Sequence, residues 1–330
     1  VVGLLGWLLL VPRPRRWLPA LAALALILTG ARLLERDWTQ PSGEPLSVVL
    51  IQGNIPQELK WSPEFLQFTL DRYRELTERH LGVDLIVWPE AALPNWYHAL
   101  AVDYLDPLAE RALAHGTELV LGIPFADLRT GDAYNSIISL GVEPGIYHKR
   151  HLVPFGEYVP LRDFFGRTLD ILGAPMSDFQ AGKESLPLRA AGRDVGVSVC
   201  YEVAFGPEVA DPLPAAEFLI NVSNDAWFGD SLAPHQHLQM ARMRALETGR
   251  AMLRATNTGI TAVLDHKGRI VAQAPQFEVA TLSAEITPRQ GATPYVLWRD
   301  KPVLGALALI FAALLVARAL ESRQLDRPAA

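Results

Sequence analysis

Cys200, the single cysteine of the 330-residue chain, lies in the stretch VGVSVCYE at 195–202. Valines alternate with small residues up to the cysteine, and this period of two predicts a β-strand that ends at the thiol. Tyr201 and Glu202 follow at once. Such a strand end could present a nucleophile beside an acid, although a free cysteine is more often a small buried hydrophobe.

Glu90 and Lys149 also follow predicted strands, in DLIVWPE and GIYHK. Because a thiol is weakly ionised at neutral pH, it needs a base or a nearby cation before it can attack. Glu90 could accept the proton. Lys149 could lower the pKa of the thiol and stabilise a tetrahedral oxyanion. Spacing alone does not bring the three groups together, and a solvated Glu90 with a surface Lys149 is the simpler alternative.

The elements that would position these residues alternate between strands and helices. Strands are predicted over 47–52, 84–88, 118–124, 134–140, 145–148, 195–200, 217–222, 260–265, 269–274 and 279–286, and helices over 63–81, 104–115 and 234–250. Alternation with several hairpins predicts an α/β fold, with a mixed sheet or a sandwich covered by helices. Ligands of open α/β sheets bind at the carboxyl ends of strands, where the three candidate groups lie.

Both ends of the chain are apolar. We expect a fragment of a transmembrane helix at 1–11, a transmembrane helix at 17–34 and a C-terminal one at 302–319, with buried core helices as the alternative. Because the chain starts with Val-Val rather than Met, we expect it to begin partway through a longer protein.

The basic residues beside these apolar segments predict an orientation. Arginines at 13, 15, 16, 318 and 323 favour a cytoplasmic first loop and tail, so the segment between the helices would lie on the far side of the membrane, which in a bacterium is the periplasm. The net charge of −6 argues against a nucleic-acid partner.

Four separated motifs, VWPEAALP, HKRHLVPFGEYVP, VSVCYE and NVSNDAWFG, resemble the nitrilase (carbon-nitrogen hydrolase) superfamily. Its Glu-Lys-Cys triad would fall on Glu90, Lys149 and Cys200. More narrowly, QGNIPQELKW, HLVPFGEYVP and RALETGRAMLRATNTG resemble the apolipoprotein N-acyltransferase family. The resemblance covers about 45–290 and the flanking helices. That family has more membrane helices before its catalytic domain, which agrees with a truncated start.

The resemblance implies a four-layer αββα sandwich over 45–290, flanked by transmembrane helices, and a ping-pong acyl transfer. Cys200 would take an acyl chain from a phospholipid as a thioester, and the α-amine of a diacylglyceryl apolipoprotein would then accept it. Glu90 would be the base, and Lys149 with the backbone N–H of Tyr201 would hold the oxyanion.

Supporting roles follow by the same resemblance. Glu157 and Glu202 would orient Lys149 and the base, and Asn135 would support the lysine loop. The predicted substrate contacts are aromatic or apolar: Trp61, Tyr201, Trp227, Phe164, Phe165 and Leu169. The last three belong to an apolar stretch, 164–176, which we expect to cover the pocket at the bilayer surface, with 94–100 as its partner.

No cofactor and no metal are expected. His235 and His237 lie on a predicted helix, and residues two apart on a helix point in opposite directions, so they cannot share a metal ion. Two other functions stay open: a membrane-tethered amidase or hydrolase, in which water resolves the acyl-enzyme, and an inactive binding module. The apolar ends favour the transferase over the hydrolase, and the complete set of triad residue types disfavours the inactive module.

Overall fold

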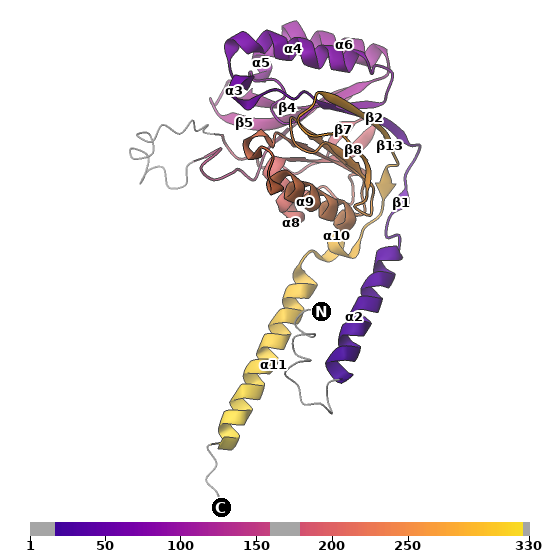
Figure 1. The fold of residues 1–330 in the computed structure, drawn as a ribbon, viewed down its shortest axis with the longest axis vertical. Helices are drawn as coiled ribbons and strands as arrows, with labels where there is room; N and C mark the ends of the chain where they lie inside the picture. Colours follow the sequence, from indigo (N-terminus) through magenta and orange to yellow (C-terminus); the bar gives the residue numbers. More distant parts are fainter. Residues whose placement is uncertain (1–16, 159–178, 326–330) are drawn as a thin grey trace, which may run out of the picture.

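The computed structural model describes residues 17–158 and 179–325. Two six-stranded sheets pack face to face, helices cover their outer faces, and two long helices project from one end of this sandwich (Figure 1). The arrangement is the four-layer αββα sandwich that the family resemblance implies.

The first sheet has the strand order β13-β2-β3-β4-β5-β6. Its strands are β2 (Leu46–Gln52), β3 (Leu85–Val87), β4 (Glu118–Ala126), β5 (Ala133–Leu140), β6 (Gly145–His148) and β13 (Ala280–Ile286). Strands β2, β3 and β4 are parallel, and the other pairs are antiparallel. The sheet is therefore mixed, and its three parallel strands carry their carboxyl ends to one edge.

The second sheet has the order β12-β11-β10-β9-β8-β7. Its strands are β7 (Leu188–Ala190), β8 (Arg193–Val199), β9 (Phe218–Ser223), β10 (Met252–Thr256), β11 (Ala262–Leu264) and β12 (Ile270–Gln273). Strands β8, β9 and β10 are parallel. A short antiparallel pair, β1 (Gln40–Pro41) with β14 (Arg289–Gln290), lies outside both sheets.

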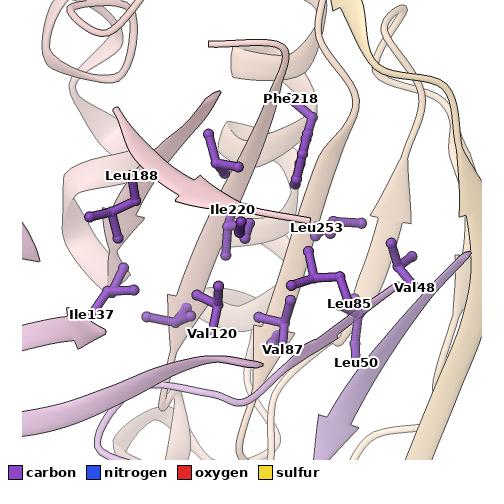
Figure 2. Close-up of a cluster of buried hydrophobic side chains, with 14 of the residues drawn as sticks. Val48, Leu50, Leu85, Val87, Val120, Ile137, Leu188, Phe218, Ile220 and Leu253 are labelled. Carbon is purple, nitrogen blue, oxygen red and sulfur yellow. The ribbon is translucent and has the colours of Figure 1, made fainter. Parts of the chain in front are cut away.

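Side chains that alternate between the two faces of a strand contribute to both the inner and the outer core. Val48 and Leu50 of β2 point into the core between the sheets, where they meet Ile220 and Leu253 of the second sheet (Figure 2). The intervening Val49 lies in the outer cluster of the same sheet. Because side chains alternate between the two faces of a strand, one buried strand serves both interfaces.

Helices close the outer faces. The helix α4 (Pro63–Glu78) and the helix α6 (Asp106–Ala114) cover the first sheet, and α9 (Leu232–Thr248) covers the second. Shorter helices are α3 (Gln57–Lys60), α5 (Tyr97–Leu100), the π-helix η2 (Ala101–Leu105), the 3₁₀-helices η3 (Cys200–Ala204) and η4 (Ala226–Phe228), α8 (Gly206–Val209) and α10 (Pro294–Trp298).

The predicted strands and helices are confirmed, with shifts of a few residues at their ends, but four strands were missed. Two of these, β1 and β14, are only two residues long. Strand β10 contains Arg254, which is fully buried. A charged residue in the middle of a strand breaks the apolar pattern by which buried strands are recognised. Strand β7 is only three residues long, Leu188–Ala190, and is too short to show a pattern.

The two long helices are α2 (Trp17–Glu35) and α11 (Lys301–Leu325), and both project from the end of the sandwich near α10 (Figure 1). They match the segments predicted at 17–34 and 302–319. Within the part of the chain whose residues can be described, no helix is long and apolar enough to cross a membrane. The fragment predicted at 1–11 lies outside the described residues.

Candidate active site

Glu90, Lys149 and Cys200 come together although they follow strands of different sheets. Glu90 comes shortly after β3, Lys149 directly after β6, and Cys200 directly after β8. The Nζ atom of Lys149 lies 3.9 Å from Oε1 of Glu90, and the charges of both groups act on the Cys200 thiol. The structure thus assembles a thiol, a carboxylate and an ammonium group.

Two neutral donors hold the Glu90 carboxylate in a buried position. Asn135 Nδ2 donates to Oε1 at 2.8 Å, and the backbone N–H of Asn224 donates to Oε2 at 3.0 Å. The β4 strand passes close behind, since a Cβ atom on Gly122 would lie 2.6 Å from Glu90 Cα. Position 122 therefore requires a glycine, because any side chain there would collide with the turn at Pro89 that positions Glu90.

Lys149 is buried, and Glu157 binds it through Oε2 at 2.7 Å. Burial alone would lower the pKa of Lys149, but the negative charges of Glu90 and Glu157 outweigh it and raise the pKa above its usual range. Asn135 connects this group, because its Nδ2 also donates to Oε1 of Glu157 at 2.9 Å and its backbone carbonyl accepts the backbone N–H of Lys149. The ammonium therefore stays charged and fixed.

Cys200 has an unusual backbone. Its φ is +50°, in the left-handed region that residues with a Cβ rarely adopt, and it begins the 3₁₀-helix η3. Burial and the charge of Glu90 raise the pKa of the thiol above its usual range, and the opposing charge of Lys149 offsets only part of that rise. The resting sulfur is therefore a protonated thiol that needs a base.

Glu202 ties the lysine strand to the cysteine strand. Its Oε1 accepts the backbone N–H of Arg150 at 2.6 Å and of His151 at 3.1 Å, and its Oε2 accepts the N–H of Val199 at 2.7 Å. Tyr147 also donates to Oε1, at 2.9 Å. Because these partners flank Lys149 on one side and Cys200 on the other, the carboxylate fixes the two groups relative to each other.

The predicted substrate contacts divide into two groups. Trp61, Tyr201 and Trp227 have exposed rings, and each is close in sequence to a residue of the site. Tyr201 also packs edge-on against Phe205, with ring centroids 5.0 Å apart. Their roles as substrate contacts stay predictions. Phe164, Phe165 and Leu169 lie outside the described residues, as does the cover predicted at 164–176.

The sequence did not single out Lys60, which is buried beside the base. Its Nζ donates to the Glu90 carbonyl at 3.3 Å, and burial lowers the pKa of Lys60 to about 8, against the opposing charge of Glu90. A second cation therefore flanks the acid. Its sequence context, ELKW within the motif QGNIPQELKW, contains no local pattern that indicates a buried lysine.

His235 and His237 point in opposite directions, as their spacing predicts: His235 is exposed and His237 is buried. His237, Asp225 and Cys200 each offer a ligand atom, and these atoms lie within 4.8 Å of one another. In this structure the histidine ring and the carboxylate are hydrogen-bonded to each other and to further groups. The absence of a metal requirement stays a prediction.

The arrangement fits attack on an acyl carbonyl. A carboxylate near a protonated thiol can take its proton as the sulfur–carbon bond forms. A fixed ammonium can then stabilise the negative charge that develops on the carbonyl oxygen. The products of such a step are a thioester and a released alcohol or amine.

Comparison with known proteins agrees with this chemistry. The carbon-nitrogen hydrolase family model matches residues 48–295. A protein named apolipoprotein N-acyltransferase from Methylococcus capsulatus is 48% identical over 93% of this chain and 61% of its own length. The protein of the same name from Nitrosomonas europaea is 44% identical, over 95% of this chain and 65% of its own length. The chain thus spans less than two thirds of these relatives.

Solved structures share the fold at low sequence identity. Nit3 of Saccharomyces cerevisiae, described as a member of branch 10 of the nitrilase superfamily, superposes with a TM-score of 0.56 at 21% identity, covering 76% of this chain and 93% of that one. A carbon-nitrogen hydrolase from Helicobacter pylori gives a TM-score of 0.55 at 16% identity, covering 74% and 89%. With the family model matched over the whole sandwich, this chain belongs to the carbon-nitrogen hydrolase family.

Proposed function

We propose that the protein is a membrane-bound N-acyltransferase, which moves an acyl chain from a phospholipid to the α-amine of the S-diacylglyceryl cysteine of an apolipoprotein. The observation that carries the proposal is the 48% identity, over 93% of the chain, to a relative named apolipoprotein N-acyltransferase. The meeting of Glu90, Lys149 and Cys200 supplies groups suited to that reaction.

In the first half-reaction, Glu90 takes the thiol proton while the Cys200 sulfur attacks the ester carbonyl carbon of the phospholipid. Lys149 and the backbone N–H of Tyr201 stabilise the tetrahedral oxyanion. The carbon–oxygen bond then breaks, and Glu90 returns the proton to the departing alcohol. Lysophospholipid leaves, and the acyl chain stays on Cys200 as a thioester.

In the second half-reaction, the amine of the apolipoprotein attacks the thioester carbonyl. Glu90 removes a proton from the attacking amine, the carbon–sulfur bond breaks, and Glu90 returns that proton to the departing sulfur, which restores the Cys200 thiol. An amide and a free enzyme result. An amine attacks a thioester more readily than an oxygen ester, because a thiolate is a better leaving group than an alkoxide. Water must be kept from the thioester until the amine arrives.

We further infer that α2 and α11 lie in a lipid bilayer and place the sandwich, residues 45–290, on the periplasmic side of the bacterial inner membrane. Large apolar side chains of both helices are exposed, including Ile27 on α2 and Leu309 and Phe311 on α11. Water would disfavour this continuous apolar surface, and hydrocarbon would stabilise it. A bilayer would also supply the phospholipid.

The fate of the thioester tests the proposal. Purified protein is mixed with phospholipid, and the mass of the Cys200 peptide is followed with and without a diacylglyceryl-cysteine peptide. We expect a thioester that persists alone and is consumed with the peptide, yielding an N-acyl amide. The Cys200→Ser variant is the control and should show no thioester. Rapid decay to free fatty acid, independent of the peptide, would identify a hydrolase instead.

A further inference from the structure

Both ring nitrogens of the buried His237 contact hydrogen-bond acceptors. Nδ1 lies 2.9 Å from Oδ1 of Asp225, and Nε2 lies 3.0 Å from the backbone carbonyl oxygen of Cys200. A carboxylate and a carbonyl only accept hydrogen bonds, so both bonds form together when both nitrogens carry a hydrogen. The geometry therefore fits the cationic ring, donating in two directions.

Asp225 is held in place for this role by a buried cation. Arg254 donates to Oδ2 at 2.7 Å, and the Ser223 hydroxyl donates to Oδ1 at 2.7 Å. Burial alone would raise the pKa of Asp225, but Arg254, His237 and Ser223 outweigh it and hold the pKa well below its usual range. An ordered chain thus runs from Arg254 through Asp225 and His237 to the Cys200 carbonyl.

The contact with that carbonyl fixes more than Cys200. The Cys200 C=O and the Tyr201 N–H belong to one peptide group, which is planar and, as a trans peptide, points the two bonds in opposite directions. A donor that holds the oxygen therefore also sets the direction of the N–H. The left-handed φ of Cys200, +50°, makes such a restraint necessary, because this conformation persists only where its surroundings hold it.

We propose that His237 is a positioning residue, which acts through the Cys200 carbonyl to aim the Tyr201 N–H at the oxyanion of the acylation step. The role rests on the proposed function insofar as it requires an acyl-enzyme. It requires neither a phospholipid nor an apolipoprotein. His237 itself touches neither the acyl group nor the sulfur's proton in this role.

Two substitutions distinguish the two hydrogen bonds of the His237 imidazole, because each is designed to keep only one of them. The amide nitrogen of glutamine reaches the place of Nε2, so His237→Gln keeps a donor to the Cys200 carbonyl. The amide of the shorter asparagine reaches only the place of Nδ1, so His237→Asn keeps the Asp225 side and loses the carbonyl. The matched control is His235→Asn, two residues away on the exposed face of α9.

Acylation is measured as the burst of nitrophenolate from a p-nitrophenyl acyl ester, and access to the thiol is measured as alkylation by iodoacetamide. Alkylation forms no oxyanion, so it does not use the Tyr201 N–H. We expect His237→Asn to lower the acylation rate about 10- to 100-fold with little change in KM and in alkylation. His237→Gln should recover most of the rate, and His235→Asn should match the wild type.

Two results would overturn the proposal: equal loss in the Gln and Asn variants, or alkylation that falls in proportion to acylation. If His237→Asn does not fold, the test rests on the folded His237→Gln variant. An acylation rate of that variant ten or more times below the wild-type rate contradicts the positioning role of His237. Failure of the proposed function is separate. It would appear as wild-type protein that reacts with the nitrophenyl ester but forms no thioester from phospholipid.

Discussion

At the scale of single residues, the chemistry of the site depends on which of Cys200, Glu90 and Lys149 carries a proton. Burial and Glu90 disfavour the Cys200 thiolate, whereas the carboxylates of Glu90 and Glu157 keep Lys149 charged. An isolated thiolate would be costly in this pocket. In the proposed reaction, the proton moves to Glu90 as the new bond forms, and the Lys149 ammonium stabilises the charge that then develops on the acyl oxygen.

The first prediction removes that proton acceptor. Glu90→Gln should keep the hydrogen bonds of its site in part but block thioester formation, lowering turnover roughly 10²–10⁴-fold, because the amide cannot take the thiol proton. Cys200→Ala should abolish turnover, and Lys149→Ala should lose a comparable factor from the oxyanion. Intact-protein mass spectrometry after phospholipid addition measures the thioester. Ordinary activity in any of the three purified variants would contradict the assignment.

The second prediction concerns pH. Because the negative charge of Glu90 raises the pKa of the Cys200 thiol, Glu90→Gln should lower that pKa and make the thiolate available at lower pH. Burial remains in the variant, so the shift should be partial. The rate of iodoacetamide alkylation against pH measures it, with Glu110→Gln on the exposed side of α6 as control. A profile unchanged, or moved to higher pH, would show that Glu90 does not act on the thiol.

At the scale of elements, the site depends on how two sheets are tied at one edge. Glu202 joins the segment after β6 to the end of β8 through backbone N–H groups at 150, 151 and 199. A carboxylate can accept all of these bonds, whereas an amide offers only one oxygen and presents hydrogens to the remaining donors.

The third prediction tests this tie. Glu202→Gln should lower the melting temperature, because a buried N–H left without its acceptor costs about 1–3 kcal/mol. Turnover should also fall, since Lys149 and Cys200 lose their common support. Glu110→Gln, an exposed change of the same kind, should alter neither property. A Glu202→Gln protein with wild-type melting and turnover would show that the tie is dispensable.

The sequence predicted elements better than it predicted their contacts. An alternating run located the strand before Cys200, a continuous apolar run located the strand before Glu90, and a hairpin pattern located the strand before Lys149. Strand β10 escaped, since Arg254 is buried there by pairing with Asp225, a partner 29 residues away. Lys60 escaped for the same reason: only the folded chain brings it against the Glu90 carbonyl. Long-range pairing leaves no local trace.

At the scale of the whole molecule, the proposed function places the apolar helices α2 and α11 in a membrane and the sandwich on its periplasmic side. The fourth prediction is that a reporter fused after residue 45 or near residue 290 reads as periplasmic, and one fused after Arg323 as cytoplasmic. Paired alkaline phosphatase and fluorescent protein fusions measure this. The reverse pattern would contradict the lipoprotein role, because it would put the sandwich on the side opposite to the one proposed.

The fifth prediction asks whether α11 is held by lipid. Ile310 lies near the middle of α11 with an exposed side chain. An aspartate at the centre of a membrane helix costs about 2.5–3.5 kcal/mol. Ile310→Asp should therefore reduce the fraction of protein that floats with membrane vesicles in a density gradient.

Leu128 provides the matched control, because it is exposed on the loop between β4 and β5, where a charge meets water. Leu128→Asp should float as the wild type does. If Ile310→Asp floats equally well, lipid does not surround this part of α11. If both variants are lost from the vesicles, the catalytic domain itself binds the bilayer through the β4–β5 loop. Loss in Ile310→Asp alone supports α11 as a membrane helix, because only there does the new charge replace contact with hydrocarbon.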